Sequence, residues 1–433
     1  MDKLLEVKEF DRIAQKNKDR SDGKYKYLNK RAFSNLVKLI EEFSSDEENT
    51  DALNFMGISR NRIVGQVVTI KNYVGLIQMS NGYKIQILPK ISLGDDEDLE
   101  NKETKRIFIK MLKSMKGFLS KVFNDANLEI GRMNLYEIFI NMYLQEVRHL
   151  VKSGIKSTYY RQEENLKYYT GKILISQHIK TNMLNKGRFY VAYDKFHPNR
   201  AENRLVKATL LKLLHLTKSA KNSKEIRQLL IAFEMVEPSK NYKNEFAQVK
   251  IWRNTKDYEI LMQWSKVFLL NESFTAFSGK NKSKSLLFPM DRLYENYVSQ
   301  QLKKMLESKG WIVSIQDNGC YLFEQPESRF ALRPDIVCNY GDRTVVMDTK
   351  WKRLNKNRLN YGISQGDMYQ MYAYSKKYKT NEMWLLYPLS NDLSKDEEIK
   401  FESEDGTTVN IYFIDLAHME DTMIELKNKL ESR

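Results

Sequence analysis

The chain has 433 residues, of which 42% are hydrophobic and 29% charged, and this length predicts a globular protein of two or three domains rather than one core. Lysine and arginine outnumber aspartate and glutamate by 71 to 56, and the net charge of +15 favours a polyanionic partner such as nucleic acid. The sequence has no apolar run of membrane-spanning length, no visible signal peptide and only two cysteines, which argues against a membrane or secreted protein and for a cytoplasmic one.

The first hundred residues have the alternation that is typical of strands. Three apolar, β-branched segments predict strands at residues 64–70, 74–79 and 83–88. Asn81-Gly82, between the last two segments, is a hairpin turn signal. We therefore expect a β-rich N-terminal domain over residues 1–102.

The pattern turns largely helical over residues 103–270, the predicted middle region. Apolar residues at three- and four-residue spacing predict helices at 107–123, 135–151 and 202–216. Residues 155–174 are mixed, with basic residues interleaved among Tyr159, Tyr160, Tyr168 and Tyr169. Such a mixture can stack on nucleic-acid bases, but tyrosines buried beside surface lysines are the commoner arrangement, and we expect it here.

The order of elements is most informative over residues 271–433. The predicted elements are a helix at 290–309, strands at 311–315 and 320–323, two strands joined by a turn at 340–343, a helix at 364–378 and a strand at 383–387. This order resembles the PD-(D/E)XK, restriction endonuclease-like, nuclease fold. The expected fold class is therefore α+β and multidomain: a β-rich N-terminal domain, a helical middle region and a C-terminal α/β nuclease domain.

Two acidic residues mark the two strands joined by that turn. Asp335 ends an Arg-Pro-Asp sequence, and Asp348 begins the triplet Asp348-Thr349-Lys350 at the end of an apolar run. Side chains of a strand alternate between its faces, so Asp348 and Lys350 are expected on one face and Thr349 on the other. Two carboxylates and an ammonium group at one sheet edge can hold a divalent metal and stabilise charge on a phosphate, as phosphodiester hydrolysis requires. The alternative is a surface hairpin with a solvated ion pair.

Further candidates lie on the two flanking helices. Glu295 is in the first turns of one helix, near its apolar face. Gln370 and Tyr374, at i and i+4, share a face of the other. Beside a metal such a pair can orient a phosphate or the scissile strand, and it resembles the Gln-xxx-Tyr helix of RecB-like nucleases. The alternative is an aromatic-rich helix that only packs on the sheet.

Four further segments extend a family pattern along the chain. They are Tyr73-Val74-Gly75 with Ile87-Leu88-Pro89-Lys90-Ile91, Thr170-Gly171-Lys172-Ile173, Asn199-Arg200-Ala201-Glu202-Asn203-Arg204-Leu205, and Phe288-Pro289-Met290-Asp291-Arg292-Leu293-Tyr294-Glu295. Together with the acidic pair and Gln370, they resemble McrC, the nuclease subunit family of the modified-cytosine (5-methylcytosine) restriction systems. No motif is recognised around residues 104–170 and 215–285.

The resemblance to McrC implies partners as well as chemistry. In that family the nuclease subunit works with a separate AAA+ GTPase subunit of McrB type, which recognises the methylated cytosine. The N-terminal portion of the nuclease subunit engages the GTPase ring and stimulates hydrolysis. The resemblance thus implies double-stranded DNA and an AAA+ GTPase as partners in a hetero-oligomer. Since the sequence has no G-x-x-x-x-G-K-[ST] loop, GTP is expected on the partner.

The expected function is therefore a Mg²⁺-dependent DNA endonuclease subunit of a GTP-dependent restriction complex. Asp335 and Asp348 are expected to ligate Mg²⁺ together with the Thr349 carbonyl. Lys350 is expected to position or help deprotonate the attacking water and to offset charge on the phosphate. The accessory candidates are Glu295, Gln370, Tyr374 and, as a phosphate contact, Arg333. Two alternatives stay open: a non-catalytic DNA-binding or NTPase-activating scaffold, and a free-standing RecB-like repair exonuclease.

Overall fold

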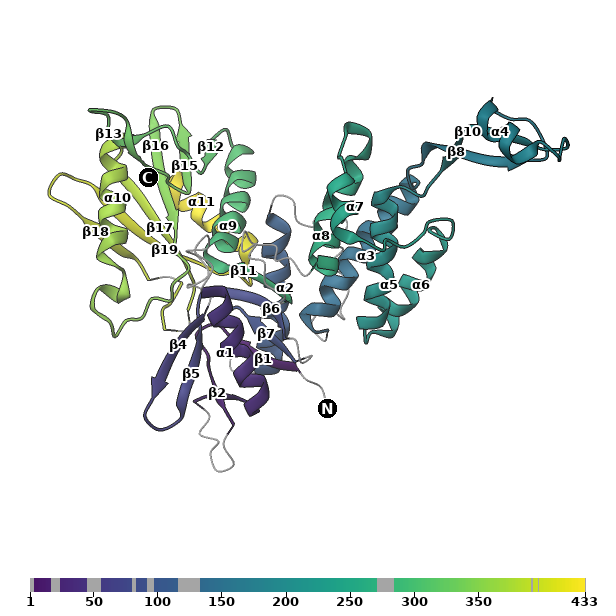
Figure 1. The fold of residues 1–433 in the computed structure, drawn as a ribbon. Helices are drawn as coiled ribbons and strands as arrows, with labels where there is room; N and C mark the ends of the chain where they lie inside the picture. The colour runs from purple at the N-terminus through teal and green to yellow at the C-terminus, as the bar shows by residue number, and fades with distance from the viewer. Residues whose placement is uncertain are drawn as a thin grey trace. The chain divides into compact units, whose positions relative to one another are not determined.

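The computed structural model describes residues 4–16, 24–44, 56–79, 83–91, 97–115, 133–270, 284–390, 392–395 and 397–432 (Figure 1). The chain divides into two compact units. One is built from both ends of the chain, Met1–Leu135 and Ser273–Arg433, and the other is Tyr136–Glu272. The domain boundaries after residues 102 and 270 stay predictions, and the Asn81-Gly82 turn lies outside the described residues.

A small four-stranded sheet and a helix begin the first unit. The sheet has the order β3-β2-β5-β4. Its strands are β2 (Arg12–Gln15), β3 (Lys26–Leu28), β4 (Met56–Asn61) and β5 (Gly65–Ile70). Helix α1 (Lys30–Ser44) packs beside β2. It buries Phe33, Leu36, Val37 and Ile40, whose three- and four-residue spacing places them on one helix face.

A second sheet joins the two ends of the chain. Its order is β1-β7-β6-β11. The strands are β1 (Leu4–Lys8), β6 (Tyr73–Gln78), β7 (Lys84–Leu88) and β11 (Lys284–Pro289). Strand β11 pairs antiparallel with β6, and α2 (Glu97–Ser114) packs against β7 and the helix that follows β11. The three strands predicted near residues 64–88 are confirmed as β5, β6 and β7.

The C-terminal segment forms a six-stranded mixed sheet of order β12-β15-β16-β17-β19-β18. The strands are β12 (Ile312–Ile315), β15 (Ile336–Tyr340), β16 (Arg343–Thr349), β17 (Glu382–Pro388), β18 (Ile399–Glu402) and β19 (Thr408–Ile414). Strands β15 and β16 form an antiparallel hairpin, while β16, β17 and β19 run parallel. The parallel strands are almost wholly buried, as expected of strands covered on both faces.

Helices and one small hairpin surround this sheet. The elements are α9 (Met290–Glu307), η4 (Leu359–Gly362), α10 (Gln365–Tyr378), α11 (Met419–Glu431), and the paired strands β13 (Tyr321–Phe323) and β14 (Arg329–Ala331). The predicted helices at 290–309 and 364–378 are confirmed as α9 and α10. The chain is thus a multidomain protein of mixed helices and sheets.

The second unit combines a group of helices with a long hairpin. The helical elements are α3 (Leu135–Ser153), α5 (Ala201–Leu216), α6 (Ala220–Ile231), α7 (Tyr242–Gln248), η3 (Arg253–Tyr258) and α8 (Glu259–Leu270). The hairpin consists of β8 (Thr158–Leu166), β9 (Lys172–Ile173), α4 (Ile175–Asn182) and β10 (Phe189–His197). Within this unit, β8, β10 and α4 extend away from the helices (Figure 1).

The tyrosines of the hairpin correct one expectation. Tyr159, Tyr160, Tyr168 and Tyr169 are 69%, 39%, 64% and 60% exposed, so the prediction that they are buried was wrong. Among the described elements, only the short helix α4 packs on the hairpin, against β10, so these tyrosines remain at the surface. Tyr159 instead packs on the neighbouring Phe196, with ring centroids 4.9 Å apart.

A buried asparagine holds the base of the hairpin. The Asn203 side-chain amide donates to the carbonyls of Lys156, at 2.9 Å, and Pro198, at 2.7 Å. Its oxygen accepts from the Tyr258 hydroxyl at 2.7 Å. Asn203 therefore ties both ends of the hairpin to the helices, which explains why the motif at residues 199–205 has an amide at this position. In the part of the chain that the structure describes, no helix has the length and apolar character needed to cross a membrane.

Candidate nuclease site

The β15–β16 hairpin brings the two predicted acids together. Ile336 pairs with Met347, so Asp335 and Asp348, each the next residue toward the open end, lie at the same end of the hairpin. Asp335 Oδ2 accepts hydrogen bonds from the Thr349 backbone N–H at 2.7 Å and from the Thr349 hydroxyl at 2.6 Å. The predicted role of Thr349 was its carbonyl alone, and the structure adds that its N–H and hydroxyl orient Asp335.

Lys350 connects the acidic pair to helix α10. Its Nζ lies 2.6 Å from Asp348 Oδ2 and donates to Gln370 Oε1 at 2.9 Å. The Gln370 amide in turn donates to the Tyr374 hydroxyl at 2.7 Å. The side chains of Asp348 and Lys350 are only 3% and 18% exposed. This pair is therefore not the solvated surface ion pair that the sequence left open.

Negative charge is concentrated in the site. Burial and the neighbouring Asp335 together raise the pKa of Asp348 to about 7, against the opposing effect of Lys350. Burial also raises the pKa of Asp335 to about 6, with Glu295 as the next contribution. For Lys350, burial lowers the pKa, but Asp348 and its hydrogen bond more than offset this effect, so the pKa is raised. The acids lack enough positive charge around them, while the lysine keeps its proton.

Glu295 reaches the same site from helix α9. Burial raises its pKa, and the charge of Asp348 adds to this effect. The Gln316 side-chain amide donates to Glu295 Oε1, and the Gln316 backbone N–H donates to the Asp335 carbonyl at 2.9 Å. Gln316 therefore links Glu295 to the strand that carries Asp335. Nothing in the sequence marks Gln316, because a lone glutamine after a short strand has no recognisable signal.

Asp367 and Lys352 are two further residues of the site that were not predicted from the sequence. Asp367 Oδ1 lies 3.7 Å from Lys350 Nζ, and its Oδ2 accepts from Lys352 Nζ at 2.8 Å. Burial raises the pKa of Asp367, but the hydrogen bonds from Lys352 and Ser364 outweigh it, and the pKa is lowered. Ser364 caps α10 by accepting from the Asp367 backbone N–H. This Ser-x-x-Asp spacing at the helix start was a visible capping signal.

Arg333 differs from the other predicted residues. Its side chain is exposed, while its backbone hydrogen-bonds to the Tyr374 hydroxyl. The structure therefore places Arg333 next to the residues linked to Lys350. The proposed contact of its side chain with a phosphate stays a prediction.

The described residues contain no group of three or more histidine, cysteine, aspartate or glutamate side chains arranged to hold a metal ion.

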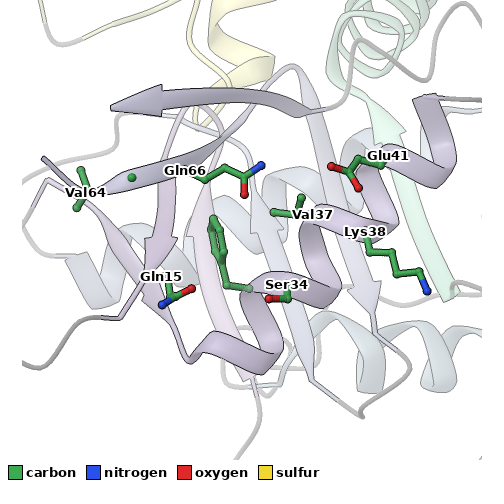
Figure 2. Close-up of a pocket in the computed structure, with 9 residues that line it drawn as sticks. Gln15, Ser34, Val37, Lys38, Glu41, Val64 and Gln66 are labelled. Carbon is green, nitrogen blue, oxygen red and sulfur yellow. The ribbon is translucent and has the colours of Figure 1, made fainter. Parts of the chain in front are cut away.

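A pocket of about 590 Å³ lies between α1 and the strands β2 and β5 (Figure 2). Its polar lining residues include Gln15, Ser34, Lys38, Glu41 and Gln66. None of the predicted site residues lines it, so the chemistry of the acidic pair is separate from this pocket.

Three comparisons place the chain among known proteins. A family model described as "McrBC 5-methylcytosine restriction system component" matches residues 68–388. The type IV methyl-directed restriction enzyme EcoKMcrBC of Escherichia coli K12 is 24% identical over 296 residues, which cover 63% of this chain and 82% of that protein.

Two solved structures from Thermococcus gammatolerans share the fold. A chain of the assembly of McrB AAA+ hexamers with bound McrC matches with a TM-score of 0.73 and 21% identity, covering 98% of this chain and 99% of that one. A chain of the McrBC complex solved by cryo-EM matches with a TM-score of 0.50 and 20% identity, covering 70% of this chain and 88% of that one. The shared fold thus extends over nearly the whole chain.

Proposed function

Because the chain belongs to the McrBC family of 5-methylcytosine restriction system components, we propose that it is the metal-dependent DNA endonuclease subunit of a GTP-dependent restriction complex. The observation that carries the proposal is the convergence of Asp335, Asp348 and Lys350 at the open end of the β15–β16 hairpin. We further propose that residues 271–433 form a nuclease domain of PD-(D/E)XK type, with the mixed sheet as its scaffold.

The residues present fit a magnesium ion. Mg²⁺ prefers oxygen ligands and keeps several of its waters, so two carboxylates and one carbonyl are sufficient. The pKa values of about 6 for Asp335 and about 7 for Asp348 indicate a site in need of positive charge. Asp335, Asp348 and the Thr349 carbonyl would hold the ion. When bound, Mg²⁺ would polarise the scissile phosphate and acidify an attacking water.

Lys350 acts as a fixed positive charge in this proposal. A lysine with a raised pKa is a poor base at neutral pH, because its ammonium form is stabilised. Lys350 therefore orients the attacking water and offsets negative charge on the phosphate in the transition state. Gln370 holds the ammonium group through Oε1, and its own amide is held by Tyr374. Glu295 completes the acidic set from α9.

The decisive experiment compares Asp348→Asn and Lys350→Met with the parent in cleavage of methylated circular DNA. Removal of one group that stabilises the transition state costs roughly 100-fold or more in rate, and we expect at least this loss in both variants. Lys400→Met is the control, since Lys400 is a partly exposed lysine of the same sheet, paired with Glu402. Folded Asp348→Asn or Lys350→Met protein that cuts at the parental rate would disprove the nuclease assignment.

We also propose an AAA+ GTPase as the partner that binds GTP, with double-stranded DNA as the substrate. The support is the T. gammatolerans assembly, in which McrC is bound to McrB AAA+ hexamers. The resemblance to McrC implies the N-terminal portion as the contact to the partner. The exposed aromatic residues of the β8–β10 hairpin favour a second candidate, because exposed apolar patches commonly mark interaction sites.

Two other functions compete with this proposal. A non-catalytic scaffold would have no need for a buried set of two acids and a lysine, since burial of charged groups is costly. A RecB-like repair exonuclease would require DNA ends. Cleavage of circular DNA separates the exonuclease from the endonuclease, and Asp348→Asn separates the scaffold from both.

A further inference from the structure

A buried carboxyl group far from the acidic pair in sequence contacts the same segment of chain. Glu9 follows β1 and is 0% exposed. Its two oxygens accept from the indole N–H of Trp351 at 3.1 and 3.2 Å, and Oε2 also accepts from the Lys90 backbone N–H at 3.1 Å. Glu9 and Trp351 are 342 positions apart.

Trp351 touches both segments that carry the candidate acids. It directly follows Lys350, and its ring lies 5.3 Å from the ring of Tyr294, the residue before Glu295. The Leu386 carbonyl accepts from the Lys350 backbone N–H at 3.0 Å and from the Tyr294 hydroxyl at 3.4 Å. The indole therefore packs on the helix bearing Glu295 and belongs to the residue that follows the segment bearing Asp348 and Lys350.

Two further hydrogen bonds connect these segments to the N-terminal part of the chain. Arg353, two residues after Trp351, donates to the Lys90 carbonyl. At the start of α9, the Met290 backbone N–H donates to the Asn72 carbonyl at 2.9 Å. Both segments that frame the site are thus attached to residues that flank β6 and β7 of the sheet β1-β7-β6-β11.

The chemical type of Glu9 is difficult to explain by packing alone. An apolar side chain would fill the space without the cost of burying a carboxyl group. Burial raises the pKa of Glu9 to about 8, even though the hydrogen bonds from Lys90 and Trp351 lower it. What the carboxyl group provides is acceptor oxygens for the indole and for the Lys90 backbone.

We propose that Glu9 and Trp351 are positioning residues for the nuclease site: the carboxyl group fixes the indole, and the indole fixes the backbone that presents Asp348 and Lys350. Neither residue is catalytic, because neither contacts the acidic pair directly. The inference rests on the proposed nuclease function. Its wider consequence is that the N-terminal sheet sets the geometry of the site.

The variants separate the hydrogen bond from the packing. Trp351→Phe keeps a ring against Tyr294 but removes the N–H donor. Glu9→Met removes both acceptor oxygens, whereas Glu9→Gln keeps one. Trp384→Phe is the matched control, because Trp384 is a buried tryptophan of the same sheet whose indole donates to another carboxylate, Glu382, at 3.0 Å.

Two measurements on the full chain test the proposal. The first is Mn²⁺ affinity by calorimetry, and the second is kcat and KM for DNA cleavage with the AAA+ partner and GTP. Loss of groups that orient metal ligands typically costs 10- to 100-fold in affinity or activity. We expect Trp351→Phe and Glu9→Met to lose about tenfold in kcat and in Mn²⁺ affinity with KM unchanged. Glu9→Gln should recover most of both, and Trp384→Phe should match the parent.

The outcomes distinguish this inference from the proposed function. If Trp351→Phe and Glu9→Met bind Mn²⁺ and cut as the parent does, while Asp348→Asn is inactive, positioning by Glu9 is wrong and the nuclease stands. If the parent does not cut, the proposed function is wrong, and the Mn²⁺ affinities alone decide whether Glu9 shapes the acidic site. A parent that binds no Mn²⁺ overturns both. If Glu9→Gln and Glu9→Met lose equally much kcat and Mn²⁺ affinity, the acceptor oxygen has no part in positioning the site.

Discussion

Several carboxyl groups in the first unit are buried, and burial changes how they ionise. Asp335, Asp348, Glu295 and Glu9 all have a raised pKa, and burial is the largest cause for each. The charges of Asp335, Asp348 and Glu295 influence one another, and under the proposed function a bound divalent cation would offset them. Glu9 lies apart from this group, and its oxygens accept from the indole of Trp351 and from the Lys90 backbone. The same physical effect therefore accompanies a group of interacting acids in one place and a single internal contact in the other.

The raised pKa of Glu9 makes stability depend on pH. Its value is 4.5 in the unfolded chain and about 8 in the folded protein, where burial and Asp291 raise it while Lys90, Trp351 and Arg353 lower it. Between these pH values the folded protein retains a proton that the unfolded chain has lost. The contribution of Glu9 to stability is thus fully present below pH 4.5 and is lost as the pH rises to about 8.

Glu9→Gln removes this titration, because an amide does not ionise in that range. We expect the melting temperature of the parent to fall, relative to Glu9→Gln, by on the order of 5 °C between pH 5 and pH 8. Thermal unfolding followed by circular dichroism at several pH values measures the difference. If the melting temperatures of the two proteins change in parallel with pH, Glu9 is ionised to the same extent in the folded and unfolded states.

At the scale of elements, the β8–β10 hairpin depends on one glycine. Gly171 has a φ of +63°, and a Cβ atom there would lie 2.3 Å from the Ala192 carbonyl oxygen. Both the backbone conformation and the close approach of β10 therefore require glycine. This accounts for the glycine in the motif at residues 170–173.

Gly171→Ala should loosen the pairing of β9 with β10. A strained backbone conformation costs about 1–3 kcal/mol, so hydrogen exchange of the amides in this pairing should become roughly 10- to 100-fold faster. Gly187→Ala is the matched control in the same hairpin, because its φ is ordinary and its nearest contact would be 3.7 Å away. Unchanged exchange in Gly171→Ala would mean that the hairpin adapts to the extra methyl group.

Local patterns predicted some elements and could not predict others. The β15–β16 hairpin, α9 and α10 have clear periodicity, and from them the sequence identified the acids, Lys350, Gln370 and Tyr374 as one group. Their individual roles stay predictions. Trp351 and Glu9 were missed, because two residues that meet only through the fold leave no periodic signal in the chain. The hairpin tyrosines were mispredicted for a related reason, since residue type alone does not reveal whether a second layer covers a strand.

At the scale of the whole molecule, the proposed partnership makes the hairpin testable. Tyr159 and Phe196 are 69% and 60% exposed and pack on each other. If this pair contacts the AAA+ partner, the double variant Tyr159→Ser, Phe196→Ser should lower stimulation of its GTPase about tenfold or more, as expected for aromatic residues central to an interface. Purified proteins and a phosphate-release assay suffice for the measurement.

A control and an alternative accompany this experiment. Ile231→Ser is the control, because Ile231 is 71% exposed on α6 in the helical part of the same unit. Full stimulation by the double variant would exclude the hairpin. In that case, the N-terminal portion implied by the resemblance to McrC would become the surface to mutate next.

The pairing of β11 with β6 constrains how this polypeptide is made. Strand β6 is in place early in synthesis, but its partner at residues 284–289 leaves the ribosome some two hundred residues later. Until then, one side of β6 presents unpaired backbone groups, which are a template for aggregation. A chain truncated before β11 should therefore be insoluble. During synthesis, β6 has to be protected until residues 284–289 are available to pair with it.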